Sequence, residues 1–424
     1  MNKNNHLRNF YILWGTQSLS QLGSSITSYA LTLWLYDVTG SSLDTAALRI
    51  CTYAPYVLVS IFAGALSDKF DKKKTMLICD LLAAVSTVMV FVLYKTDLLC
   101  VWHIYLINVI SGLMNTFQQP ASEVAFTLIT PKDCYQKTGV LQALSRSLIS
   151  IGHPIIAAAV YGLAGLEAAI AVDMVTFIIA FLSLALFIKL PKVSRESTEG
   201  KGTLRLAREG LSYLKSKPMI LYVILFMAGV NLISSAFEAT LPGYIKPNPL
   251  GGNYVLGIVS SCSGIAMIIG SLIFTKMPKP KDRVRVIYLS MLFSLGTENF
   301  ILAFSRSPVL WCIGQILGWI FVPVMSANQN VIMRNEIPVE LQGRVYACRN
   351  TLQFFTIPIG LFLGGFLVDN ICEPYMRDSS YALSFFFGSG KGSGAAMVLF
   401  ILGVAGTLMC LVFGRILKKY SYSD

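Results

Sequence analysis

The sequence contains few charged residues, few histidines and no paired cysteine motif. Charged side chains make up 13% of its 424 residues, whereas soluble domains usually carry about a quarter. Its three histidines and nine scattered cysteines form neither an HExxH nor a CxxC pattern, and no GxxxxGK[ST] phosphate loop occurs. These absences argue against metal catalysis, a redox function and ATP-driven pumping, and no metal site is expected.

Apolar residues, by contrast, make up 54% of the chain. Apolar runs of about 20 residues, the length that crosses about 30 Å of hydrocarbon, recur from Phe10 almost to Lys418. The first run is too long for the core of a signal peptide, so it is expected to be retained as a span. The runs predict an all-α polytopic membrane protein with twelve spanning helices, at 10–36, 46–66, 75–95, 100–121, 139–163, 168–190, 219–245, 254–275, 285–304, 308–332, 346–369 and 394–417.

The net charge of +12 is distributed unevenly between alternate loops. Basic residues gather in the segments that lie in the cytoplasm if the N-terminus does, including Lys72 to Lys74, 189–217, 276–285 and Arg415 to Lys419. Cytoplasmic loops of membrane proteins carry an excess of Lys and Arg. This pattern predicts that both termini are cytoplasmic and explains the positive charge without a nucleic-acid partner. Compact loops and the lack of organelle signals predict a bacterial cytoplasmic membrane.

The longest polar stretch, 191–218, lies midway along the chain. It predicts a cytoplasmic basic linker between an N-terminal six-helix bundle, 1–190, and a C-terminal six-helix bundle, 219–424. Within the linker Leu211 and Leu214 recur near helical spacing beside basic residues, which is typical of an amphipathic helix on the inner leaflet. A solvated charged linker with partial helix is the alternative.

Short internal repeats support two related halves. Gly64-Ala65-Leu66 in the first half and Gly270-Ser271-Leu272 in the second each precede a basic loop at the equivalent hairpin. Such repeats are typical of transporters built from two homologous bundles. The two six-helix bundles are therefore expected to be pseudo-symmetric.

The loop between the second and third expected spans carries the most specific motif. Gly64 to Lys74 reads GALSDKFDKKK, which resembles the major facilitator superfamily signature loop, G-x-L-x-D-[RK]-x-G-[RK]-[RK], with Asp71 in place of the second glycine. The resemblance implies the major facilitator fold and a conformational gate formed by Gly64, Asp68, Lys69 and Lys72. Glycine permits close helix packing, an aspartate at a helix end can pair with a basic group, and the lysines suit an anionic leaflet.

Further short motifs are similar to the macrolide-efflux and related drug and siderophore exporter branch of the superfamily. The motifs are Phe117 to Ala121, Pro131 to Asp133, Ala171 to Asp173, Pro338 to Val345 and Pro358 to Gly360. The resemblance extends over nearly the whole chain. It implies a secondary antiporter that exports an amphipathic small molecule in exchange for protons. The chain is also expected to work as a monomer in a lipid bilayer and to need no cofactor.

The fifth expected span bears on antiport. Drug antiporters of the superfamily often carry a glycine-proline motif there, whereas this chain has His153 between Gly152 and Pro154. Pro154 removes a backbone donor and can bend the helix where a rocking motion could use it. An ordinary packing kink is the alternative.

Ionisable side chains inside a membrane cost at least a few kcal/mol each by insertion scales, so they are functional candidates. Asp173, Glu238 and Glu298 fall inside expected spans and are candidates for binding the coupling proton. Arg146, about two turns into the fifth expected span, is a candidate cavity residue. For Asp173 a structural pairing within the first half is the alternative. Polar side chains that could line a substrate cavity, or instead tie helices together, include Gln17, Gln21, Asn115, Gln118, Gln142, Asn231, Gln315 and Gln329.

The leading hypothesis is thus proton-coupled efflux. Uptake or flipping of a metabolite or lipid-like solute through the same fold is the alternative within transport. An intramembrane enzyme or a sensor is the alternative outside transport, but no nucleophile and base pair, metal cluster or nucleotide loop occurs, and no segment is long enough for a soluble sensing domain. The chain is therefore expected not to be an enzyme.

Overall fold

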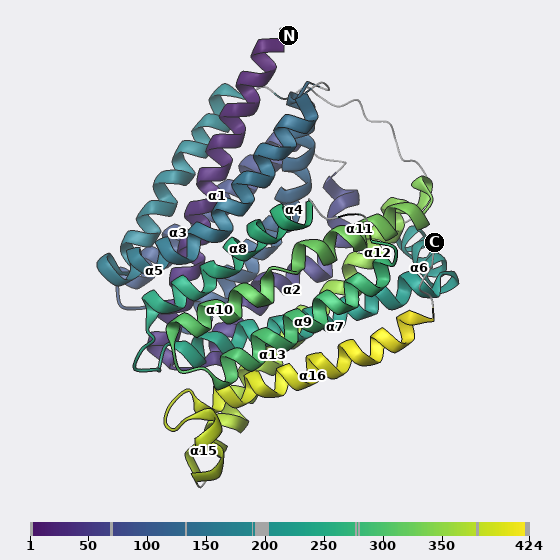
Figure 1. Cartoon of the computed structure of the whole chain (residues 1–424). Coiled ribbons are helices and arrows are strands. Elements are labelled where there is room, and N and C mark those ends of the chain that lie inside the picture. Colours follow the sequence, from purple (N-terminus) through teal and green to yellow (C-terminus); the bar gives the residue numbers. More distant parts are fainter. Residues whose placement is uncertain are drawn as a thin grey trace. The chain divides into compact units, whose positions relative to one another are not determined.

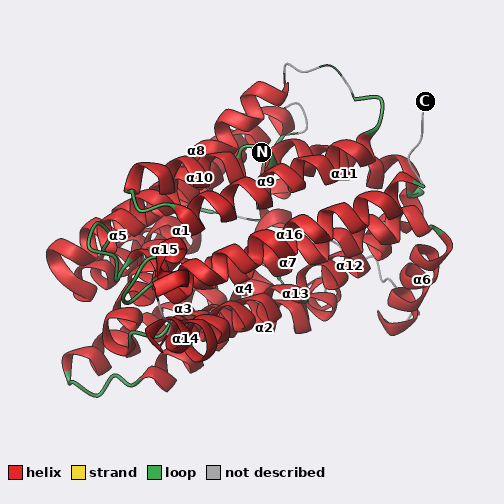
Figure 2. Cartoon of the chain, turned by 60° about the horizontal axis from the view of Figure 1, so that its bottom comes forward, coloured by secondary structure: helices red, strands yellow, loops and turns green. Residues whose placement is uncertain are grey.

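The computed structural model describes residues 3–67, 71–131, 134–188, 190, 203–275, 278, 280–378 and 381–419. Regular secondary structure in these ranges is helical throughout, without a strand (Figure 2), which confirms the all-α prediction. Eight helical segments of the described chain are long and apolar enough to cross a membrane. The count of twelve spans and their arrangement as two six-helix bundles stay predictions.

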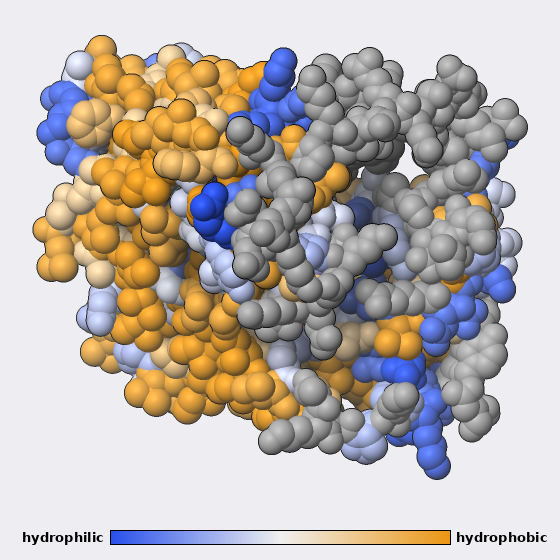
Figure 3. All heavy atoms as spheres, turned by 90° about the horizontal axis from the view of Figure 1, so that it is seen from above, coloured by the Kyte–Doolittle hydropathy of each residue, from blue (hydrophilic) through white to orange (hydrophobic). Residues whose placement is uncertain are grey.

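The exposed surface is that of a membrane protein. Large apolar side chains lie open on many helices, with Leu163 exposed by 90%, Leu58 by 71% and Leu186 by 69%. Apolar residues cover wide continuous areas of the face shown in Figure 3. Patches of this extent are unfavourable in water but match contact with lipid.

The contacts divide the chain into two compact units, of which the first comprises Met1–Asp37 and Cys51–Gly200. Its helices are α1 (Lys3–Thr39), most of α2 (Ser42–Ser67), α3 (Lys72–Lys95), α4 (Val101–Ile129) and α5 (Tyr135–Leu182), which continues into a π-helical turn, Ser183–Phe187 (Figure 1). Helix α5 breaks at Gly165, whose φ of 74° favours glycine. This break lies between the expected spans 139–163 and 168–190.

One core cluster shows how the helices of the first unit run. It joins Phe10 and Leu13 at the start of α1, Met76 at the start of α3, Ile129 at the end of α4 and Leu184 after α5. Since helix starts meet helix ends, α1 and α3 run in one direction, and α4 and the last part of α5 run in the other.

The second unit comprises Val38–Ile50 and Lys201–Asp424, so the first turns of α2 belong to it. Its other elements are α6 (Thr203–Ser216), α7 (Pro218–Ile245), α8 (Asn253–Thr275), α9 (Arg283–Phe304), α10 (Pro308–Trp319), α11 (Val322–Glu336), α12 (Val339–Phe354), α13 (Thr356–Phe366), the π-helical turn Leu367–Cys372, α14 (Glu373–Asp378), α15 (Tyr381–Phe387) and α16 (Ser393–Lys418).

Two expected spans of this unit are interrupted. The span 308–332 divides between α10 and α11, and the span 346–369 divides between α12 and α13. Each interruption precedes a proline, Pro323 or Pro358, which supplies no backbone N–H to the carbonyl four residues earlier. The prolines thus account for breaks that the apolar runs alone did not predict.

Helix α6 lies within the polar stretch 191–218. Its Leu214 is fully buried against Ile220, Met333 and Ile337, and the Tyr213 hydroxyl donates to the Glu336 carbonyl at 2.6 Å. Leu211 is 39% exposed. Part of the apolar side of this helix therefore packs on other helices of the second unit. Its contact with the inner leaflet stays a prediction.

Candidate transport site

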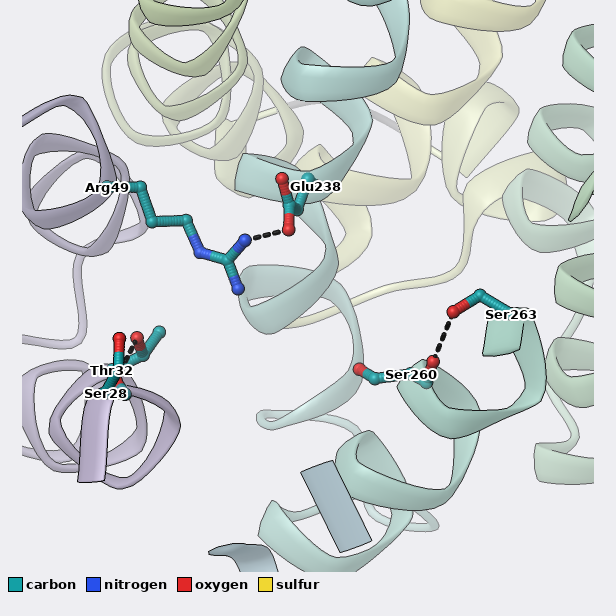
Figure 4. Close-up of polar contacts among 6 residues, drawn as sticks. All are labelled: Ser28, Thr32, Arg49, Glu238, Ser260 and Ser263. Carbon is teal, nitrogen blue, oxygen red and sulfur yellow. Dashed lines mark hydrogen bonds and ion pairs between the residues drawn. The ribbon is translucent and has the colours of Figure 1, made fainter. Parts of the chain in front are cut away.

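A polar stripe runs along α1 in the first unit. Gln21, Ser24 and Ser28 are exposed and Gln17 is half-buried, at intervals of three or four residues, so these side chains share one helix face. Thr32 continues beyond the exposed part and donates to the Ser28 carbonyl at 3.0 Å (Figure 4). A polar face of a membrane-spanning helix faces protein or a water-filled cavity rather than lipid, so this stripe is a candidate cavity wall.

Helices α4 and α5 carry the other polar residues predicted for the first unit. Asn115, like Gln119 and Glu123 further along α4, is exposed. Arg146 is exposed on α5. Pro154 is buried, and α5 has helical backbone angles there, the break being at Gly165. Within α5 the sharp break therefore occurs at the glycine and not at the proline.

Asp173, a predicted proton site, is 6% exposed on α5. Its carboxylate accepts hydrogen bonds from the Ser24 hydroxyl of α1 at 2.8 Å and from the Thr87 hydroxyl of α3 at 3.3 Å. Gly23 of α1 faces Asp173 and Thr176 so closely that a Cβ there would clash. Close packing at this glycine holds Ser24 against the carboxylate.

Asp80 is a second buried carboxylate of this unit that the sequence analysis missed. It lies on α3, is 8% exposed, and accepts from the Gln118 amide of α4 in a short hydrogen bond and from the Gln17 amide of α1 at 3.5 Å. A check of every charged residue within the expected spans would have found it, because it lies five residues inside 75–95. Gln118, predicted as a cavity residue, is thus a partner of a carboxylate.

Glu298, another predicted proton site, is 5% exposed on α9 of the second unit. The Trp319 indole N–H of α10 donates to its Oε1 at 3.1 Å. A Cβ on Gly318 would lie 2.5 Å from the Glu298 carboxyl group, so only glycine leaves room for it. In the described part of the chain this carboxylate forms no ion pair.

The remaining predicted residues of the second unit have different surroundings. The Asn231 amide of α7 donates to the Gln353 carbonyl at 2.8 Å, which ties α7 to α12. Gln315 of α10 is 3% exposed, and its side-chain oxygen has no hydrogen-bond partner among the described residues. An unsatisfied buried oxygen is costly, so Gln315 remains a candidate for contact with a ligand or water.

Glu238, the third predicted proton site, forms an ion pair with Arg49 (Figure 4). The Glu238 side chain, on α7, is 45% exposed, and the Arg49 side chain, in the first turns of α2, is 26% exposed. Both residues belong to the second unit. Figure 4 also shows the Ser263 hydroxyl of α8 donating to the Ser260 carbonyl, at 2.7 Å. Arg49 neutralises Glu238, which distinguishes it from Asp173 and Glu298.

The first turns of α2 are held by a further carboxylate, Asp369, which sequence reasoning did not single out. It accepts from the Ser41 hydroxyl at 2.7 Å and from the backbone N–H groups of Leu43 at 2.8 Å and Ser42 at 3.2 Å. The N–H groups at a helix start lack partners within the helix, so Asp369 caps α2. We call Ser41–Leu43, Arg49, Glu238 and Asp369 the α2 clamp.

The signature loop is described only at its edges. Asp68 and Lys69 lie outside the described residues, and Gly64 lies in α2. Lys72 begins α3, whose N-cap is Asp71, the carboxylate of which accepts from the Lys74 N–H at 3.0 Å. The aspartate that replaces the usual glycine therefore caps the following helix.

Apolar spanning helices, a polar α1 face and buried carboxylates define the class of protein as a multi-pass membrane transporter. Residues 6–383 match the family described as transmembrane secretion effector, and the chain belongs to that family, within the major facilitator superfamily. This match also confirms the superfamily predicted from the signature loop.

Individual relatives place the chain in the macrolide-efflux branch. It is 26% identical over 377 residues to macrolide efflux protein A of Streptococcus pyogenes, covering 87% of this chain and 91% of that protein. It is 24% identical over 362 residues to the multidrug efflux pump Tap of Mycolicibacterium fortuitum, covering 82% and 86%. The crystal structure of a mutant of the nucleoside transporter NupG has the same fold, with a TM-score of 0.69, 14% identity and coverage of 97% and 99%. The chain is a transporter and not an enzyme, as predicted.

Proposed function

We propose that this protein exports amphipathic small molecules from a bacterial cell in exchange for protons. The observation that carries the proposal is the pair of buried carboxylates, Asp173 and Glu298, each bound by uncharged donors. Charged groups at membrane depth are costly unless they are neutralised, and proton binding neutralises a carboxylate. The efflux activities named for the relatives support export as the direction and amphipathic drugs as the class of substrate.

The proton gradient would supply the energy, and no cofactor is required. One elementary charge that moves through ~100 mV releases about 2.3 kcal/mol, enough for roughly fiftyfold concentration. We further propose that a monomer works in the cytoplasmic membrane with both termini in the cytoplasm, in accord with the basic residues of alternate loops.

Alternating access is the second part of the proposal. Helix α2 contributes its first turns to the second unit and its remainder to the first. Pro55 leaves the Cys51 carbonyl without its helical donor at the point where one part meets the other. The α2 clamp would hold its end of α2 on the second unit in one state and release it in the other.

Resistance of cells tests the proposal directly. Efflux-deficient bacteria that express the chain are expected to survive at least fourfold higher concentrations of a macrolide or a lipophilic dye, and a protonophore is expected to abolish this protection. Growth is measured across a panel of macrolides, dyes and lipophilic cations at equal membrane abundance. Protection that persists with the protonophore would exclude proton coupling, and no protection would favour uptake or flipping of another solute.

The pairing of Glu238 leads to a separate prediction. Because Arg49 neutralises it and exposed ion pairs contribute about 1 kcal/mol or less, Glu238→Gln is expected to change the rate of proton-driven export by less than about fivefold. Export is measured in proteoliposomes with an imposed pH gradient, with Glu167→Gln, which breaks the exposed Lys95 pair, as the matched control. Complete loss of coupling in Glu238→Gln alone would instead identify Glu238 as a proton carrier.

A further inference from the structure

Asp80 is the only acidic residue of α3, between Lys72 and Lys95. It is 8% exposed, and its partners within hydrogen-bond distance are two uncharged amides, Gln17 and Gln118. In the described part of the chain it forms no ion pair. Two amide donors offset only part of the free-energy cost of an ionised group at membrane depth. A purely structural role therefore does not explain why an aspartate occupies this position.

The position of Asp80 repeats that of Asp173 along two helices. On α1, Gln17 contacts Asp80 and Ser24 contacts Asp173; on α3, Asp80 itself and Thr87 occupy the corresponding positions. Both intervals are seven residues, which is about two turns or about 10.5 Å of helix. The two carboxylates therefore lie at two levels of one seam between α1 and α3.

The polar stripe of α1 connects these two levels. Gln17 and Ser24 belong to it, and the exposed Gln21 lies between them. Each carboxylate is thus one hydrogen bond away from the polar stripe, which is half-buried at Gln17 and exposed at Gln21 and Ser24. Water at that face therefore lies close to both carboxylates, because the side chain that contacts each carboxylate belongs to the same face.

We propose that Asp80 is a second proton-binding site of the first unit, at the level of the seam nearer the start of α1, and that it acts with Asp173 in coupling. This inference rests on the proposed proton-coupled export. It assigns a function to a residue that matches no motif of the sequence.

Other charged and titratable groups do not neutralise Asp80. Lys73, two turns earlier on α3, is engaged with the carbonyls of Ala185 at 2.9 Å and Ile188 at 2.7 Å. Other charged or titratable groups on the elements around Asp80 include the neighbouring thiol of Cys79 on α3, Arg8 on α1, Glu123 on α4, and Arg146 and Asp173 on α5. In the described chain none of them forms a hydrogen bond or ion pair with Asp80.

Infrared titration of the full chain in lipid bilayers tests the site with the proton alone as probe. The wild type is expected to show two buried carboxyl groups in the first unit that gain and lose a proton as pH is varied. Asp80→Asn is expected to remove one carbonyl band and Asp173→Asn the other, whereas Glu123→Gln, an exposed carboxylate of α4, is expected to remove neither. An unchanged spectrum in Asp80→Asn would mean that Asp80 stays ionised and is structural, which overturns the proposal.

Transport supplies the second readout, with erythromycin as probe. Asp80→Asn is expected to reduce export driven by a pH gradient about tenfold while downhill exchange stays within twofold of the wild type, and Asp80→Glu is expected to recover part of the driven rate. Equal losses of both rates would indicate a packing role and overturn the proposal. If the wild type does not transport erythromycin, the proposal that the chain exports macrolides is wrong. The infrared titration still decides whether Asp80 binds a proton.

Discussion

A disulfide between Ser42→Cys and Gly243→Cys is expected to stop export almost completely, and reduction is expected to restore it. A Cβ on Gly243 would lie 3.5 Å from the Ser42 Cβ, which matches the separation of about 3.5–4.5 Å in disulfides. The bond would fix the first turns of α2 to α7 beside the α2 clamp. If alternating access requires the clamp to release, the oxidised protein remains in one state.

The experiment uses a background in which the nine native cysteines are replaced, since all nine are free. Export of a macrolide is measured in vesicles after oxidation and again after reduction. The control is Leu295→Cys with Gly406→Cys, which joins α9 to α16 inside the second unit. The two Cβ positions lie 3.2 Å apart, just below the range for disulfides, so these helices must separate slightly for the bond to form. Full export by the oxidised Ser42–Gly243 pair would show that the first turns of α2 stay on the second unit throughout the cycle, and the clamp would then have no gating role.

The contacts that carry this prediction are absent from the sequence pattern. Asp369 is separated from Ser41 by 328 residues and Arg49 from Glu238 by 189. Periodicity and charge counts describe neighbours along one helix, so they predict that a segment is helical but not which distant helix it touches. Ser41, Ser42 and Asp369 lie near the ends of two expected spans, 46–66 and 346–369, and their contact is evident only in the folded structure.

The helices themselves were largely predictable. The expected spans 75–95, 254–275, 285–304 and 394–417 differ from α3, α8, α9 and α16 by three residues or fewer at either end, because long apolar runs between basic loops leave little choice of boundary. The interruptions before Pro323 and Pro358 were not predicted, since the apolar runs continue through them.

The buried carboxylates could be predicted from the sequence, but their hydrogen-bond partners could not. An acidic residue within an apolar run is conspicuous, so Asp173 and Glu298 were identified as candidates. Their partners were not, because serine, threonine and tryptophan are common in such helices and only packing selects Ser24, Thr87 and Trp319. The requirement for glycine at position 318 was likewise not predictable, because it arises from the Glu298 carboxyl group that lies against it.

Glu298→Gln is expected to reduce export driven by a pH gradient at least tenfold while downhill exchange of the same macrolide continues near the wild-type rate. Glutamine has nearly the shape of glutamate, and its carbonyl oxygen still accepts the Trp319 N–H, but the amide cannot take up or release a proton. The change therefore removes proton binding with little change in packing. Driven and downhill transport are both measured in proteoliposomes, so that the two rates come from the same preparation.

Two further variants separate proton binding from packing at this site. Trp319→Phe removes the donor to Glu298 and keeps the carboxylate, so driven export is expected to persist with an altered pH dependence. Gly318→Val places side-chain atoms where the Glu298 carboxyl group lies, and is expected to reduce driven and downhill transport together. Driven export by Glu298→Gln at the wild-type rate would remove Glu298 from the coupling mechanism and leave the carboxylates of the first unit, Asp173 and Asp80, as the groups through which a proton must pass.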